Sequence, residues 1–389
     1  MLREAETCDA MRTLGYARAC VLHLLRWLPS LLLLVPWLLG PLAPSEAARV
    51  RDLSSADGFR LLDWETVHLG QKLGALWAAL SGETGDASAD ASALRAYFAQ
   101  TPRPADLRPA AETALEHLVA QAYRDSGVTQ AEPSSVPGVF PPVLVSLTAP
   151  PNVLVLSPRT ELRVVGSSVL QPMDLAAQQR LEASADSTGV SSLVAPIGGL
   201  ATYPAMVLDN GSAQQVLSAS AHEWVHQYLI FYPLGQGYWR SQATREINET
   251  TAEMIGNEVG AGIASSLGLA APADTSRVRR PSAFDFRGFM RDTRTHVEQL
   301  LAAGQVDEAE AYMRAQRDEL QRRGYQIRKL NQAYFALYGS YGESDAASPA
   351  NPIPGLLHQL RDQSGSVGEF LLRVRTLTSV EELRRAVSA

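Results

Sequence analysis

The sequence predicts an α+β protein that is mainly helical, with a small sheet and a central pair of helices flanked by N- and C-terminal helices. Three observations predict this class. Apolar residues recur at helical spacing over most of the chain beyond residue 48. Short runs rich in Val and Leu, separated by turn residues, are concentrated in residues 143–169. Two charged motifs, at 222–226 and 248–253, lie within helical patterns that are otherwise largely apolar.

The first 48 residues form a membrane-targeting segment. Four arginines precede the uncharged 17-residue stretch Trp27–Ala43. Two interpretations compete: a signal peptide cleaved after Ala47, or an uncleaved membrane anchor. Three prolines in or beside the apolar stretch weaken a spanning helix, whereas the basic region before it is long for a signal peptide. In either case the preceding positive charge predicts that the rest of the chain lies outside the cytoplasm, secreted or held at the cell membrane.

Cysteine content and charge narrow the function. Both cysteines, Cys8 and Cys20, lie in the first 48 residues, so the remaining chain has no disulfide, thiol nucleophile or cysteine metal ligand. The net charge is −7 and no basic cluster follows the leader, which argues against nucleic-acid binding. The sequence gives no indication of an oligomeric state.

Beyond the leader, the patterns divide the chain into four parts. They are a helical N-terminal region (49–130), a Pro-rich linker (131–142), a core with the sheet (143–265) and a helical C-terminal region (266–389) that completes the cleft of that core. The expected helices outside the central pair are 63–80, 110–127, 173–185, 288–304, 306–324, 325–339 and 367–387, and the expected strands are 143–147, 152–157 and 162–170.

The run HEWVH at 222–226 is the most informative motif. His222 and His226 are four residues apart, so on a helix both imidazoles project from one face and can bind one metal ion. Glu223 lies beside them. A zinc hydrolase needs three protein ligands, an open position for water and a carboxylate that takes the proton of that water. The motif therefore supplies two ligands and a general base.

A second helix offers the third ligand. Glu249 and Glu253 are four apart on one face, whereas Glu258 is nine residues from Glu249 and about 13 Å further along the axis. Apolar and small neighbours favour a buried, closely packed helix over a solvated one.

These two motifs, within residues 215–265, resemble those of the gluzincin metallopeptidases, in which HExxH is followed by a helix bearing Asn-Glu and an acidic residue four positions on. The run 329–343 is also similar to a helix in a group of membrane-associated bacterial aminopeptidase-like proteins of the HExxH type. The resemblance implies a zincin-like catalytic core with one Zn²⁺ per chain, held by His222, His226 and Glu249. It implies that Glu253 hydrogen-bonds the first motif histidine from outside the ligand set.

The expected function is a zinc metallopeptidase acting on a peptide or protein substrate. By the resemblance, the segment 201–208 is an edge strand that pairs with an extended peptide; an ordinary internal strand is the alternative. The oxyanion needs a donor beside the metal, and the candidates are Tyr334, Tyr338 and Tyr341, followed by Tyr238 and His296. Two other functions stay open: hydrolysis of a non-peptide amide, and a non-catalytic, membrane-tethered interaction protein with a vestigial metal site.

Overall fold

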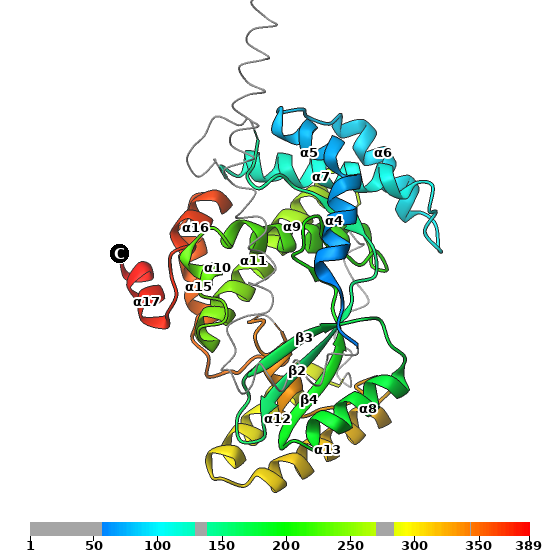
Figure 1. Ribbon diagram of the computed structural model, residues 1–389. Helices are drawn as coiled ribbons and strands as arrows, with labels where there is room; N and C mark the ends of the chain where they lie inside the picture. The colour runs from blue at the N-terminus through cyan, green and yellow to red at the C-terminus, as the bar shows by residue number, and fades with distance from the viewer. Residues whose placement is uncertain (1–56, 129–137, 270–283, 343) are drawn as a thin grey trace, which may run out of the picture.

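The computed structural model describes residues 57–128, 138–269, 284–342 and 344–389 (Figure 1). It is 57% helix with two small sheets, which confirms the expectation of a mainly helical α+β protein. The segment expected to target the membrane and most of the expected Pro-rich linker lie outside the described residues. Within the described ranges, none of the helices combines the length and apolar character that a bilayer crossing requires.

The helices gather into an N-terminal group, a central pair and a C-terminal group. The N-terminal group is α4 (Leu61–Gln71), α5 (Leu73–Leu80), α6 (Ala87–Phe98) and α7 (Arg108–Asp125). The central helices are α9 (Ala213–Leu229) and α11 (Gln242–Ser266), joined through the short α10 (Pro233–Gln236). The others are α8 (Leu175–Asp186), α12 (Phe286–Ala302), α13 (Val306–Arg322), α14 (Gln332–Tyr338), α15 (Ile353–Asp362), α16 (Val367–Val374) and α17 (Val380–Ser388).

The strands form two separate three-stranded sheets. The first has the order β3 (Gly166–Leu170), β2 (Asn152–Pro158), β4 (Val190–Pro196) and is antiparallel. The second has the order β1 (Val145–Leu147), β6 (Ala205–Val207), β5 (Gly199–Leu200), with β1 parallel and β5 antiparallel to β6. Only two residues separate β4 from β5, so the two sheets lie next to each other.

The described chain forms two bodies of structure (Figure 1), and residues of both line one cavity. The helical body contains α6, α7, α9–α11, α15–α17 and the strands β1 and β6, which share one large apolar cluster, and α5, whose Leu76 and Leu80 belong to a smaller cluster of their own. The sheet body contains β3-β2-β4 with α8 and α12–α14, and has its own smaller clusters. Because both bodies contribute walls, residues distant in sequence meet at the cavity.

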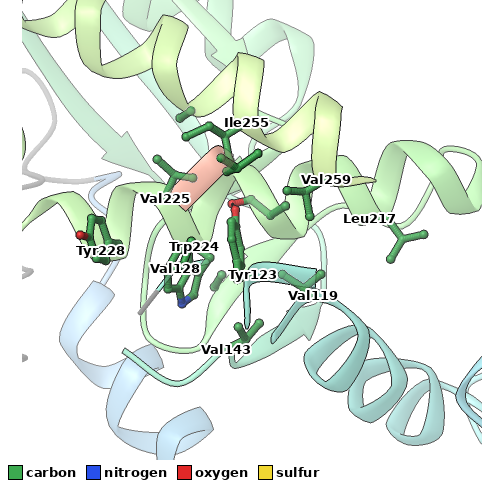
Figure 2. Packing of buried hydrophobic residues seen from close by; sticks show 14 of the residues in the cluster. Val119, Tyr123, Val128, Val143, Leu217, Trp224, Val225, Tyr228, Ile255 and Val259 are labelled. Carbon is green, nitrogen blue, oxygen red and sulfur yellow. The ribbon is translucent and has the colours of Figure 1, made fainter. Parts of the chain in front are cut away.

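Helix α9 packs against α7. Figure 2 shows Tyr123 of α7 and Trp224 of α9 within the main apolar cluster, their ring centroids 4.1 Å apart. The Tyr123 hydroxyl donates to the carbonyl of Ala221 at 2.8 Å, and the Trp224 indole donates to the carbonyl of Pro141 at 2.7 Å. The buried hydroxyl and indole N–H groups of these two aromatic side chains therefore both have hydrogen-bond partners. The apolar side chains of α9 that face this cluster, among them Trp224, Tyr228 and Leu229, are buried.

Helices α9 and α11 approach so closely that glycine is required. A Cβ atom on Gly256 would lie 2.8 Å from the Ser218 carbonyl oxygen and 2.9 Å from the His222 Cβ. On Gly260 it would lie 2.4 Å from the Ser218 backbone nitrogen. Exposed Gly262, on the same helix, has nothing within 4 Å. The close approach brings the two charged motifs together.

The half-buried carboxyl group of Glu65 links α4 to the turn after β5. The Tyr203 backbone N–H donates to Glu65 Oε1 at 3.0 Å. Burial raises the pKa of Glu65 to about 7, although this hydrogen bond favours the ionised form.

Several predicted boundaries were wrong. The helix expected at 63–80 breaks at Lys72, whose ammonium turns inward to Glu112 (2.9 Å) and Glu116 (2.8 Å). The helix expected to start at residue 325 begins only at Gln332, because the Asn331 side chain caps it by accepting from the Tyr334 N–H. The helix expected at 367–387 is two helices, α16 and α17, with a Ser379 cap starting the second.

Candidate metal centre and active-site cavity

The side chains of His222, His226 and Glu249 converge on one point. The two Nε2 atoms are 3.0 Å apart, and Glu249 Oε2 lies 3.8 Å from His222 Nε2 and 3.4 Å from His226 Nε2. Among the described residues, these three form the one group of His, Cys, Asp and Glu that could hold a metal ion. The two histidines come from the same face of α9, and the glutamate comes from α11.

The spacing of the three donor atoms fits a small tetrahedral ion. Zinc–ligand bonds of roughly 2.0–2.1 Å place neighbouring ligand atoms about 3.4 Å apart in a tetrahedron. The three observed separations, 3.0, 3.4 and 3.8 Å, centre on this value. Two imidazoles and one carboxylate also form a donor set that zinc accepts in catalytic sites, where a fourth position stays open.

His226 is held in the tautomer that a metal ligand needs. Its Nδ1 lies 2.7 Å from Asn248 Oδ1, a pure acceptor, so Nδ1 carries a proton and Nε2 is the nitrogen that faces the group; a bound metal ion would take the place of any proton on Nε2. Asn248 is fully buried and precedes Glu249 on α11, so adjacent residues supply a ligand and the orienting partner of another ligand.

Glu249 is an ionised carboxylate held from two sides. Burial alone would raise its pKa, but His226 and the hydroxyl of Tyr238, which donates to Glu249 Oε1, hold the pKa near 2. The two histidines differ from each other. Burial lowers the pKa of His222 to about 3, with His226 adding to the shift. For His226 the attraction of Glu249 outweighs burial and raises the pKa to about 9. Of the two histidines, His226 therefore favours the protonated form, beside the ionised Glu249, and His222 favours the neutral form.

Glu223 lies beside the group without belonging to it. Its side chain is buried against β5: a Cβ on Gly199 would lie 2.2 Å from Glu223 Oε1. Burial raises the pKa of Glu223 to about 8. A cation held by the neighbouring donors would favour the ionised carboxylate and lower this pKa. The position suits a proton acceptor next to a metal site.

A cavity of about 640 Å³ opens over the convergent group, within the range typical of small-molecule and peptide-binding clefts. One wall is apolar, formed by Val153, Val155 and Val169 of the sheet β3-β2-β4. The floor is formed by α9 and α11, and the α14 end of the sheet body closes it with Tyr338 and Tyr341.

The structure separates the candidate oxyanion donors. Tyr341 lines the cavity with its ring 6.4 Å from that of His222, and Tyr338 lines it as well. Tyr334 is not among the lining residues, because it lies one turn back on α14 and packs on Tyr338. His296 is also elsewhere, stacked edge-on against Tyr312.

The expectation of an edge strand at 201–208 was wrong in position. The strand there is β6, which lies in the middle of its sheet between β1 and β5. The Thr202 N–H donates to the Leu200 carbonyl at 2.7 Å, so the chain turns back and places Gly199–Leu200 on the outside. The Leu208 N–H donates to the Gly198 carbonyl, and by antiparallel alternation the N–H and C=O of Gly199 point away from β6, at the cavity.

Two further acidic residues of α11, Glu253 and Glu258, lie inside and outside the cavity, respectively. Glu253 lines the cavity one turn beyond Glu249; its hydrogen bond to His222 stays a prediction. Glu258 is outside the cavity and forms a two-pronged ion pair with Arg361, at 2.6 and 2.9 Å.

Similarity searches found no matching family model, no matching curated protein and no matching solved structure. The chemistry of the site is therefore argued from its own residues. Sequence reasoning missed the contact of Asn248 with His226, the edge position of Gly199 and the place of Arg245 in the cavity lining; the Asn-Glu pair at 248–249 was a usable signal for the first of them.

Proposed function

We propose that this protein is a zinc-dependent metallopeptidase with a zincin-like catalytic core. One observation carries the proposal: a buried carboxylate, Glu223, stands next to three convergent metal-ligand side chains but is not one of them. A purely structural metal site has no use for such a group. Its presence favours catalysis over the alternative of a vestigial site in an interaction protein.

The residues have separate roles. His222, His226 and Glu249 would hold the ion, with Asn248 orienting His226 and Tyr238 orienting Glu249. When bound, zinc supplies a Lewis acid that makes water nucleophilic near neutral pH and polarises the substrate carbonyl. Glu223 accepts a proton from the attacking water and later delivers it to the nitrogen of the leaving amine.

The oxyanion formed at the substrate carbonyl needs a hydrogen-bond donor. Tyr341 fits this role best among the sequence candidates, because it lines the cavity and its ring centroid lies 6.4 Å from that of His222. Burial and the neighbouring carboxylates Glu249 and Glu223 raise the pKa of Tyr341, which keeps the hydroxyl protonated and able to donate.

A peptide substrate fits this cavity better than a compact amide. The outward N–H and C=O of Gly199 offer an extended backbone one pair of strand-like hydrogen bonds directly beside Glu223. The apolar wall of β2 and β3 residues offers room for a substrate side chain.

The proposed location is outside the cytoplasm, secreted or tethered to the membrane by the N-terminal segment. The arginines before Trp27–Ala43 support this orientation. A reporter fused after residue 60 is expected to be active on the outer side of the membrane; activity confined to the cytoplasm would refute the proposal. Protein sequencing of the mature N-terminus separates a cleaved signal from an anchor.

Turnover of a quenched peptide library by zinc-loaded protein tests the function. Glu223→Gln should retain about one zinc per chain and lose at least 10²- to 10⁴-fold in kcat, the amount typical of a proton-transfer group. Glu258→Gln is the matched control, because this exposed carboxylate is paired with Arg361, and it should cleave like the wild type. Wild-type protein that holds zinc and cleaves no peptide would contradict the proposal.

A further inference from the structure

An arginine with an unusual environment lies in the active-site cavity. Arg245 is on α11 one turn before Glu249, lines the cavity and is only 8% exposed. Its guanidinium lies over two aromatic rings, 4.2 Å from the Trp239 centroid and 5.1 Å from the Tyr238 centroid. Because Tyr238 also donates to Glu249, one ring separates this cation from the metal-ligand group.

No carboxylate of the described chain forms an ion pair with Arg245, and its guanidinium donates no hydrogen bond to another described residue. Nearby Glu246 accepts instead from Gln242 and Asn351, each at 2.9 Å. The comparison is Arg294, equally buried at 6%, whose guanidinium donates to Glu298 and to the carbonyls of Phe335 and Ala346. The guanidinium of a buried arginine normally donates hydrogen bonds to carboxylates or carbonyls, as that of Arg294 does.

Stacking on aromatic faces satisfies the charge of Arg245 in part but leaves the N–H groups in the guanidinium plane unused. Those groups form a fork that matches the two oxygens of a carboxylate. Arg245 is also the one lysine or arginine among the described residues that line the cavity. The cavity thus contains a preformed, largely buried receptor for one negative charge.

We infer that Arg245 determines substrate specificity by binding a carboxylate of the peptide, close to the bond that is cleaved. This inference rests on the proposed function. The carboxylate comes either from an Asp or Glu side chain or from the C-terminus of a short peptide. In either case the apolar valine wall takes the neighbouring side chain, and Glu223 and the metal-ligand group act on the adjacent peptide bond.

Binding to a catalytically silent protein tests the inference without relying on activity. Zinc-loaded Glu223→Gln protein would be titrated calorimetrically with three sets of acetylated hexapeptides: neutral and C-terminally amidated, amidated with one Glu at each position in turn, and neutral with a free C-terminus. We expect one acidic set to bind about 10- to 100-fold more tightly than the neutral set, as hydrogen bonds between charged groups contribute in desolvated sites. The set that gains affinity identifies the source of the carboxylate.

Three substitutions of Arg245, each made in the Glu223→Gln protein, test whether Arg245 causes the gain in affinity for acidic peptides. Arg245→Gln should abolish the gain, Arg245→Lys should keep a small part of it, and Arg245→Glu should transfer the preference to lysine-containing peptides. Arg240→Gln, at an exposed arginine outside the cavity, should bind like the parent. Equal binding of acidic and neutral peptides by the parent, or a loss in Arg245→Gln that affects neutral and acidic peptides alike, would overturn the inference.

The failure of the inference and the failure of the proposed function give different results. Library cleavage with no dependence on Arg245 would refute only the specificity. Arg245-dependent carboxylate binding by a zinc-loaded wild type that cleaves none of the peptides would refute the peptidase and leave the anion site in place.

Discussion

The close contact between α9 and α11 can be tested with two alanine substitutions on one helix. Gly260 packs directly on α9: an added Cβ would lie 2.3 Å from the Ser218 hydroxyl and 2.4–2.5 Å from the Ser218 backbone nitrogen and Cα. The hydroxyl can rotate away, but the backbone atoms cannot. Gly260→Ala therefore forces the helices apart. Gly262 faces open space two residues later.

The expected energies follow from this contrast. Both substitutions gain up to about 1 kcal/mol, because alanine favours the helix over glycine. Overpacking at Gly260 costs roughly 1–3 kcal/mol or more, and rigid backbone contacts place it at the upper end. Gly262→Ala should therefore be slightly more stable than the wild type. Gly260→Ala should be less stable than Gly262→Ala by about 2–4 kcal/mol.

Urea unfolding followed by tryptophan fluorescence, with zinc chelated, measures the difference in the free energy of unfolding. A second assay uses the metal site. Ser218 lies one turn before His222, so its displacement should also weaken zinc binding about tenfold or more, whereas Gly262→Ala should leave the zinc affinity unchanged. Equal stability and equal zinc affinity of the two variants would refute the conclusion that the glycines set the position of the metal-ligand group.

Three other perturbations are informative. Glu249→Ala should abolish tight zinc binding, Glu253→Ala should weaken it about 10- to 100-fold, and Glu258→Ala should leave it nearly unchanged. If Glu249→Ala retained zinc and Glu253→Ala lost it, the third ligand would be Glu253, one helical turn further along. Asn248→Ala should lower zinc affinity by a similar 10- to 100-fold, measured by competition with a chelator, and wild-type affinity would exclude an orienting role. The third concerns pH. Burial raises the pKa of Glu65 to about 7, so the folded state binds this proton more tightly than the unfolded chain and stability falls as the pH rises from about 4.5 to about 7. Glu65→Gln should be more stable than the wild type by roughly 2–3 kcal/mol at pH 8 and equal to it near pH 4 in urea titrations; a pH-independent difference would contradict the raised pKa of Glu65.

The metal-ligand side chains could be predicted because their signal is local. His222 and His226 share a helix face, and Glu249 and Glu253 share another, through spacing alone. The close packing of the second helix was also foreseeable from Gly256 and its neighbours. Helix and strand types followed from periodicity for the same reason: each depends on residues close together in the sequence.

The structural features that the sequence did not predict depend on contacts between segments that are distant in the chain. The break at Lys72 is set by two glutamates on α7, about 40 residues away, and periodicity carries no trace of them. The edge position of Gly199 required knowing that β1 pairs with the far side of β6. Arg245 looked like any charged residue at a helix start until the structure placed it on Tyr238 and Trp239, inside the cavity.

Zinc-edge anomalous diffraction from crystals of the zinc-loaded protein tests the central claim most directly. The account predicts one anomalous peak at roughly 2.0–2.2 Å from His222 Nε2, His226 Nε2 and a carboxylate oxygen of Glu249, with Glu223 outside the coordination sphere. A crystal without a peak at this position, or a peak whose ligands include Glu223, would contradict it.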